Sequence, residues 1–472
     1  MFRATLWLTV ATLAGLLLGF AREWLLVAAW GAGARSDGFL VALFIPEAVR
    51  MTLAAGLLSA AALPLYQQAK GADGARWISS QLVNLSGLGV LIAALAAVMP
   101  ALWVGLIGPG LPAQAQYHAA DSLRLLALTL PLFLLHALAM VVGQARERFF
   151  LAGMGSFVYN LPAVLVLLWQ GKQVTEAMLS QAFVAGAVAM VLSMLPVLWG
   201  AGWRPWQWSL DTGSMRTLYT RLGPLLLSAS ASQGLVLLER VCASWLGEGA
   251  ITLVNLARKL VNLPLVALMS LNQVLLSKMV SLANDPLARR KALKVGWGVT
   301  AALTVPAAAG MIGAAPVLVT WALPKEVAGG PLPGLLAWFA VVIVFGAWNA
   351  LLARYAYAVG DTVTPLRCEL AGSAVNAGVL LLVPWLGWGM TGIAWAALLG
   401  CLVTGYLLLR RYGLLNERWV WLLPPVASAA LLMAGLYLHG LAAGFLQFAL
   451  ASAHSMLWLA VLMLWVKRIA RD

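Results

Sequence analysis

The amino-acid sequence predicts an all-α integral membrane protein with about 14 transmembrane helices, arranged as two six-helix lobes followed by two C-terminal helices. Two observations predict this fold class. Of the 472 residues, 62% are hydrophobic and only 10% are charged, a composition typical of polytopic membrane proteins. The apolar residues also fall into runs of about 20 or more, which is the length that a helix needs to cross a bilayer.

The expected spans are apolar runs bounded by charges, Gly-Pro pairs or polar clusters. They cover residues 4–31, 36–66, 78–108, 119–144, 149–170, 176–200, 216–246, 249–281, 292–321, 332–358, 365–386, 389–411, 419–440 and 443–466. The first run is expected to be a membrane helix and not a signal peptide, because no small-residue cleavage site follows a short apolar core.

The basic residues predict the orientation of the chain. With the N-terminus placed inside, the inner segments carry nineteen Lys and Arg residues, and the outer loops carry only Arg35, Lys172 and Lys325. Positive charge accumulates on the cytoplasmic side of membrane proteins. The sequence therefore predicts that both termini are cytoplasmic, and that the net charge of +14 reflects basic inner loops and no nucleic-acid partner.

The chain is expected to divide at residues 201–215, where Trp203, Trp206 and Trp208 surround Arg204 and Pro205. Trp rings anchor at membrane interfaces, which favours an interfacial linker. The expected units are an N-terminal lobe at 1–200, a C-terminal lobe at 216–411 and two additional helices within 412–472.

Five charged residues inside the expected spans are the main functional signal: Arg22, Glu23, Arg50, Arg258 and Lys259. A charge at the bilayer centre costs at least about 2.5 to 3.5 kcal/mol, so it normally faces a water-filled cavity or a partner. Four of the five are cations, which indicates an anionic substrate. Because guanidinium groups match phosphate oxygens in bidentate geometry, these cations are candidates for gripping a diphosphate.

A structural role is the alternative for the same arginines. Arg22 or Arg50 would then be neutralised by Glu23, Asp37 or Glu47. The two interpretations are compatible if the acids orient the arginines, and Glu23 and Asp37 are the candidate orienting acids.

A second group of polar residues inside the spans is a candidate for ion coupling. Glu239 and Arg240 are adjacent, while Glu369 and Asn376 are seven residues apart and so share a helix face. The alternative for the first pair is a self-neutralising couple. Coupling to the membrane potential, to H⁺ or to Na⁺ stays open, and no bound cofactor is expected.

Other functional classes have no support in the sequence. The phosphate-binding pattern GxxxxGK[ST] is absent, so direct use of ATP is not expected. The three Cys and four His residues lack metal-ligand spacing, and no catalytic constellation stands out. A membrane-embedded glycan polymerase or ligase would need a large outer loop, whereas the longest expected outer loop is near 322–331. Transport is therefore favoured over catalysis.

Residues 18–66, with GFAR, GAG, Asp37, Pro46 and Arg50, resemble the start of the MurJ/MviN-type lipid II flippases. Residues 232–260 and the segment GDTVTPLR at 360–367 are also similar to that family, which belongs to the multidrug/oligosaccharidyl-lipid/polysaccharide exporter superfamily. The resemblance implies a flippase for polyprenyl-diphosphate-linked saccharides in the bacterial cytoplasmic (inner) membrane. Glycan-synthesis enzymes are then candidate partners, beside the lipid-linked substrate and the bilayer.

The resemblance also implies site residues. The cavity arginines of the family fall on Arg22 and Arg50, its later arginine falls on Lys259 with Arg258 beside it, and its acid falls on Glu23.

Three features depart from the family pattern. Leu16 and Ala55 stand where the family carries an arginine and a glutamate, and the Glu239–Arg240 pair resembles that of O-antigen and exopolysaccharide flippases. Lipid II and an exopolysaccharide repeat unit are both open as cargo at this point. A drug or cation antiporter of the same superfamily is disfavoured, because it would need a cavity dominated by acids.

Overall fold

The computed structural model describes residues 2–54, 56–69, 72–148, 153–207, 209–262, 285–323 and 330–471, together with the short stretches at 279, 281–282 and 327. Every regular element formed by these residues is a helix. The predicted all-α fold class is therefore confirmed for the described part of the chain.

The contacts divide the chain into two compact units, residues 1–252 and residues 253–472. Unit 1 contains α1 (Phe2–Trp30), α2 (Ala34–Ala54), α3 (Leu57–Gln68), α4 (Ala72–Val98), α5 (Pro100–Ile107), α6 (Ala113–Leu126), α7 (Thr129–Ala145), α9 (Gly155–Gln170), the 3₁₀ turn η1 (Gly171–Gln173), α10 (Glu176–Gly200) and α11 (Thr212–Trp245). Helix α12 (Ala250–Asn262) begins in unit 1 and continues into unit 2.

Unit 2 holds the remaining helices. They are α14 (Pro286–Ala322), α16 (Leu332–Ala358), α17 (Val363–Leu386), α18 (Thr391–Arg411), α19 (Arg418–Met433), the π-helical turn η2 (Ala434–Leu438) and α20 (Phe445–Arg471). Each predicted span thus contains helix. The predicted span 249–281 corresponds to α12, and its part beyond residue 262 lies outside the described residues, apart from 279 and 281.

The predicted count of fourteen membrane crossings is not confirmed by the described residues. Within the described residues, nine helices are long and apolar enough to span a bilayer, and eleven if each of two bent pairs is one span. The bent pairs are α2 with α3, at 43°, and α6 with α7, at 41°. Glycine explains the first bend, because Gly56 has a positive φ of 87° that a residue with a side chain rarely adopts. Fourteen crossings therefore stay a prediction.

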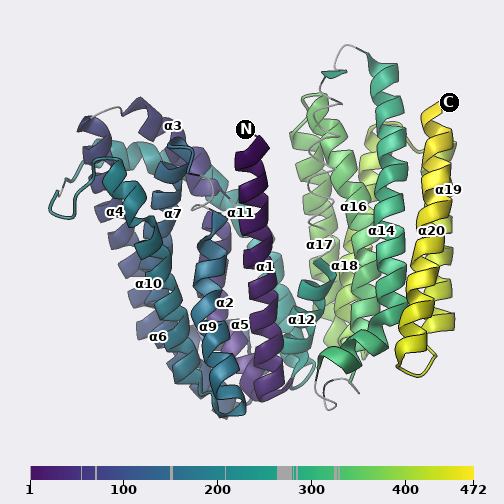
Figure 1. Ribbon diagram of the computed structural model, residues 1–472, viewed down its shortest axis with the longest axis horizontal. Coiled ribbons are helices and arrows are strands. Elements are labelled where there is room, and N and C mark those ends of the chain that lie inside the picture. Colours follow the sequence, from purple (N-terminus) through teal and green to yellow (C-terminus); the bar gives the residue numbers. More distant parts are fainter. Residues whose placement is uncertain are drawn as a thin grey trace. The chain divides into compact units, whose positions relative to one another are not determined.

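In unit 1, α9 lies between α1 and α10, and α7 lies between α10 and α4 (Figure 1). Close contact of α9 with α10 depends on glycine at position 186, where an added Cβ would lie 2.2 Å from the backbone oxygen of Tyr159. This contact holds Tyr159 in the interior of the unit, where it has no exposed surface.

The predicted linker at 201–215 packs against unit 1. Asp211 donates its backbone N–H to Ser80 at 3.0 Å, and Gln81 donates to Ser214 at 2.7 Å. Further along α11, the Tyr219 hydroxyl donates a hydrogen bond to the Asn84 side-chain oxygen at 2.7 Å. These polar contacts join α11 to α4 within unit 1, which extends to Thr252. The predicted lobes at 1–200 and 216–411 stay a prediction.

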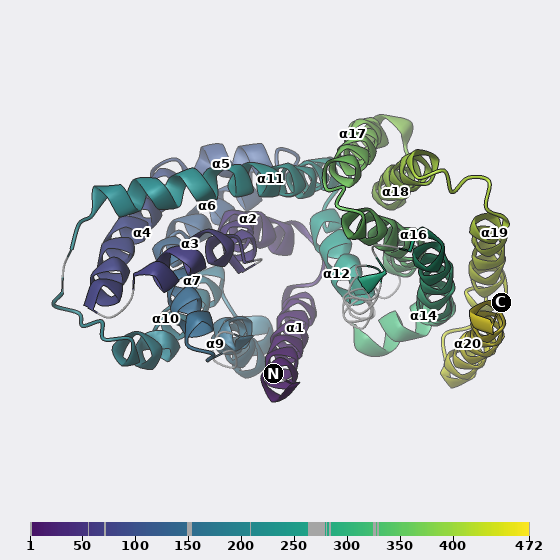
Figure 2. The same cartoon turned by 90° about the horizontal axis from the view of Figure 1, so that it is seen from above.

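In unit 2, α14 packs against both α16 and α20, and α17 packs against α18 (Figure 2). The centre of its core is aromatic. Trp297 of α14 stacks on Trp348 of α16 with ring centroids 4.8 Å apart and planes 8° apart, and Trp419 meets Trp297 edge-on. Such ring pairs add about 0.5 to 1.5 kcal/mol beyond the burial of their area.

Candidate functional site

Arg22 lies at the centre of a buried polar network in unit 1. Its side chain is only 4% exposed. The guanidinium donates to Glu47 and to Asn160, both at 2.8 Å, and forms an ion pair with the neighbouring Glu23. It also lies over the Phe183 ring, 5.0 Å from the ring centroid. The charge of Arg22 is therefore compensated inside the protein, as the ion-pair alternative predicted.

Arg50 is less completely satisfied. Its side chain is 11% exposed and lies 4.0 Å from the Glu47 carboxylate, which already binds Arg22. The Arg50 guanidinium donates to the Ser156 hydroxyl at 3.2 Å and stacks on the Tyr159 ring at 4.8 Å. Its Nε has no hydrogen-bond partner among the described residues. Arg50 thus keeps an N–H donor available for a ligand, whereas the N–H donors of Arg22 bind protein partners.

Two further buried polar groups accompany Arg50. The Tyr159 hydroxyl and His136 Nε2 have no hydrogen-bond partner in the described part of the chain, although their residues are at most 4% exposed. His136 lies against α9, since a Cβ on Gly155 would come within 2.7 Å of its ring. Buried polar groups are nearly always paired in native proteins. The unpaired groups around Arg50 therefore make its surroundings a candidate binding site.

Sequence analysis did not identify these neighbours of Arg22 and Arg50. Ser156, Tyr159 and Asn160 lie at helical spacing in the predicted span 149–170, and uncharged polar residues are common in such spans. The one available signal was that spacing, which places the three side chains on one face of a helix.

Asp37 lies elsewhere. Its carboxylate accepts hydrogen bonds from the backbone N–H of Gly249 at 2.7 Å and of Thr252 at 2.8 Å, and from the Thr252 hydroxyl at 2.6 Å. A carboxylate at these positions compensates the free N–H groups at the start of α12. Asp37 therefore anchors a helix N-terminus in the structure, whereas the sequence suggested that it orients an arginine.

The Glu239–Arg240 pair faces the same network from α11. Arg240 donates to the backbone oxygen of Leu40 at 2.6 Å and stacks on Phe44 at 4.8 Å. The carboxylates of Glu47 and Glu23 act on it electrostatically. Glu239 is 6% exposed. The network in the described residues therefore joins three arginines with three glutamates, so the acids and cations of this network are equal in number.

The two remaining predicted cations belong to unit 2. Arg258 lies over the Phe339 ring, 5.0 Å from its centroid, and both Arg258 and Lys259 are half-buried with further interactions. An aromatic face is a favourable place for a guanidinium that is partly removed from water.

The predicted coupling residues on α17 have different environments. Glu369 is exposed, whereas Asn376 is 8% exposed and its Oδ1 has no partner among the described residues. Asn376 packs against α18, where a Cβ on Gly400 would lie 2.9 Å from its own Cβ.

Comparison with known proteins identifies the family. The family model described as lipid II flippase MurJ matches residues 26–465, which is most of the chain. The chain belongs to the MurJ family of lipid II flippases. It is accordingly a multi-pass membrane protein of a transporter family, as the resemblance over residues 18–66 predicted.

Curated relatives support the family over most of their length. The probable lipid II flippase MurJ of Thermotoga maritima is 24% identical over 401 residues, covering 84% of this chain and 82% of the relative. The probable lipid II flippase MurJ of Vibrio cholerae is 26% identical over 461 residues, covering 90% of this chain and 86% of the relative.

Solved structures agree in fold. A lipid II flippase MurJ in an inward closed conformation matches with a TM-score of 0.84 at 18% identity, covering 98% of this chain and 99% of that chain. An inward-facing multidrug resistance MATE transporter of the MOP superfamily matches with a TM-score of 0.68 at 14% identity, covering 86% of this chain and 96% of that chain. These likenesses show that the chain has the fold of the solved MurJ structure.

Proposed function

We propose that this chain flips lipid II, a polyprenyl-diphosphate-linked saccharide, across the bacterial cytoplasmic membrane by alternating access. The observation that carries the proposal is Arg50, a cation within a predicted span that retains unpaired donor capacity. A guanidinium with a free N–H group inside a membrane span is suited to bind the charged oxygens of a diphosphate. Membership of the MurJ family supports the lipid-linked cargo.

Within this proposal the two arginines of unit 1 have different tasks. Arg50 contacts the diphosphate, and Arg22 holds Glu47 at 2.8 Å so that this acid does not neutralise Arg50 completely. Glu23 orients Arg22 from the adjacent position. Arg258 and Lys259, which the sequence predicted to bind the same diphosphate, stay candidates for that role.

The decisive experiment is substitution of Arg50 in a flipping assay with purified protein in liposomes. Arg50→Ala should abolish flipping, and Arg50→Lys should restore little because a point charge lacks the bidentate fork. Loss of hydrogen bonds to a charged group, about 1.5 to 3 kcal/mol, corresponds to roughly 10- to 150-fold weaker substrate binding.

Arg124→Ala is the matched control, because Arg124 is an exposed arginine paired only with Asp121 among the described residues. It should flip at the wild-type rate. Full activity of Arg50→Ala would remove Arg50 from the site.

Depletion in cells tests the cargo. If lipid II is the cargo, cells should lyse and lipid II should accumulate in the inner leaflet. Growth with loss of only a secreted polymer would instead assign an exopolysaccharide or O-antigen repeat unit, the alternative raised by Leu16, Ala55 and the Glu239–Arg240 pair. Leu16 is 44% exposed on α1, and Ala55 lies outside the described residues.

The energy source is proposed to be the membrane potential or an ion gradient, because no ATP-binding motif occurs in the chain. Glu239 and Asn376 are the proposed coupling residues, since both are buried polar groups within helices. Glu369 and Arg240 are the accompanying candidates. Flipping in liposomes with an imposed potential, H⁺ gradient or Na⁺ gradient would separate the three sources.

A further inference from the structure

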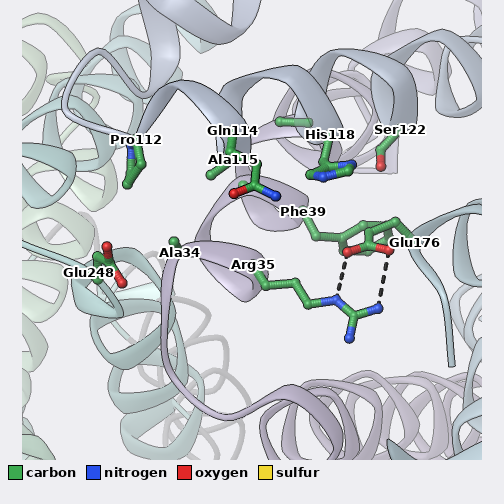
Figure 3. Close-up of a pocket in the computed structure, with 12 residues that line it drawn as sticks. Ala34, Arg35, Phe39, Pro112, Gln114, Ala115, His118, Ser122, Glu176 and Glu248 are labelled. Carbon is green, nitrogen blue, oxygen red and sulfur yellow. Dashed lines mark hydrogen bonds and ion pairs between the residues drawn. The ribbon is translucent and has the colours of Figure 1, made fainter. Parts of the chain in front are cut away.

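A cavity opens in unit 1 where α2, α6 and α10 begin. Its volume is about 430 Å³, and its wall is completed by Glu248 in the turn before α12 (Figure 3). This volume is within the range of small-molecule pockets, about 300 to 1,000 Å³. The cavity lies apart from the Arg22–Arg50 network, because none of the residues of that network lines it.

One wall of the cavity is a stripe of polar side chains on α6. Gln114, His118 and Ser122 follow each other at intervals of four residues, so they lie on one face of the helix. Figure 3 shows them on the same side of α6, facing Arg35 and Glu176. None of the three forms a hydrogen bond within the described residues, although Ser122 is only 3% exposed.

The beginning of α6 adds backbone donors to this wall. Its N-cap is Pro112, which provides no side-chain cap, and no acid occupies the first turn. Pro112, Gln114 and Ala115 of this turn line the cavity. The first N–H groups of a helix have no partner within it, so a ligand here meets free donors as well as the side chains.

The opposite wall is charged but internally neutralised. Arg35 donates to both carboxylate oxygens of Glu176, at 2.6 and 3.1 Å, and to the Val174 backbone oxygen at 3.0 Å. The same guanidinium stacks on Trp30 at 4.4 Å from the ring centroid. Arg35 therefore has little charge to offer an anionic ligand, and Glu176 has little to offer a cationic one.

The remaining lining groups limit the ligand further. Glu248 is exposed and has no partner among the described residues, so it disfavours an anion and accepts hydrogen bonds. The uncapped start of α6 disfavours a cation, because a helix N-terminus carries partial positive charge. Phe39 also lines the cavity, but it is only 2% exposed and offers a ligand almost no apolar surface. A ligand that suits Glu248 and the start of α6 together is neutral and rich in hydrogen-bond donors and acceptors.

We propose that this cavity binds a neutral saccharide. Sugar hydroxyls both donate and accept hydrogen bonds, as do the Gln114 amide and the Ser122 hydroxyl, and the His118 imidazole adds a ring N–H donor. The predicted topology places the start of α2, α6 and α10 at the outer face, so the saccharide would approach from outside the cell. The cavity is a separate site from the one in the proposed function, and its occupancy does not depend on Arg50.

The test is direct binding with the full-length protein in nanodiscs, by saturation-transfer NMR and calorimetry. Two neutral disaccharides, cellobiose with hydroxyl groups only and N,N′-diacetylchitobiose with acetamido groups, serve as probes, and inorganic phosphate is the charged counter-probe. At least one disaccharide should bind saturably, and phosphate should not compete with it. Ser122→Ala and Gln114→Ala should each weaken binding about two- to tenfold, the effect of one lost hydrogen bond.

Asp121→Asn is the control variant, because Asp121 is on α6 but does not line the cavity. It should bind the disaccharide as the wild type does, and so should Arg50→Ala. Absence of saturable binding of both probes up to about 20 mM, or equal binding by the Ser122 and Gln114 variants, overturns the proposal. Competition by phosphate would overturn it as well, and would assign an anion site. None of these outcomes alters the test of Arg50 in flipping.

Discussion

Replacement of Arg22 by Met tests whether the buried network of unit 1 is structural. Met has a similar length and no charge, so the variant removes the cation without leaving a large cavity. Glu23 and Glu47 would then keep their charges in the interior without the guanidinium that binds both of them. Glu23 is 2% exposed, so water cannot replace that partner.

The expected loss is large. Removal of one partner from a buried ion pair costs about 3 to 5 kcal/mol, because the other charge stays buried and uncompensated. Unit 1 spans residues 1–252, and for a domain of about this size 1 kcal/mol corresponds to roughly 2 to 4 °C in melting temperature. Arg22→Met should therefore lower the melting temperature by roughly 6 to 20 °C.

Arg50→Met provides the contrast. It removes one hydrogen bond to Ser156 and one ring contact with Tyr159, and it leaves Glu47 paired with Arg22. These contacts are worth about 1 to 2 kcal/mol together, or roughly 2 to 8 °C. Arg50→Met should thus fold well and yet fail to flip, which separates a structural arginine from a functional one.

The assay is thermal unfolding of the purified variants in one detergent, followed by size-exclusion recovery. The triple variant Arg22→Met with Glu23→Gln and Glu47→Gln also removes the two carboxylates that bind Arg22 and should regain part of the lost stability, since a neutral replacement of a buried ion pair is often nearly neutral. A melting temperature of Arg22→Met within about 2 °C of the wild type would refute the assigned role of the network.

Three other predictions concern different parts of the chain. Gly186→Ala should cost about 1 to 3 kcal/mol and lower the melting temperature, because its Cβ would lie 2.2 Å from a backbone oxygen of α9; wild-type melting would contradict the close contact. Hydrogen bonds from the backbone N–H of Thr364 and the hydroxyl of Tyr412 lower the pKa of Asp361. The stability that these hydrogen bonds contribute should be fully present above the ordinary Asp pKa of about 3.9 and should be lost as pH falls through the lowered pKa. Asp361→Asn should therefore make the melting temperature depend less on pH in the acidic range. A cysteine at position 325 should react with an impermeant maleimide in intact cells, and labelling only after lysis would contradict cytoplasmic termini.

Much of the fold is evident from the sequence because hydrophobicity acts locally. A run of about 20 apolar residues has to become a helix in a bilayer, whatever its neighbours are. The spans expected at 332–358 and 176–200 coincide with α16 and α10 for this reason. The bends between α2 and α3 and between α6 and α7 were not predicted, since they depend on backbone conformation and packing more than on composition.

Some features of the site follow from the sequence, and others depend on the tertiary structure. The sequence by itself determined which residues are costly to place in a membrane, and Arg22, Glu23, Arg50 and Arg240 all lie in one network of unit 1. Only the tertiary structure decided their partners. Asn160, a neutral residue 138 positions from Arg22, binds its guanidinium, and such a contact has no signature in local sequence.

Asp37 illustrates the same division. The sequence identified it as a candidate orienting acid for Arg22 or Arg50, whereas in the structure its carboxylate binds Gly249 and Thr252 at the start of α12. A buried carboxylate binds whatever donors the fold brings within hydrogen-bond distance, and packing between distant segments decides which donors those are. Charge and burial cost are properties of a residue and can be taken from the sequence, whereas a hydrogen-bond partner is a property of the folded arrangement.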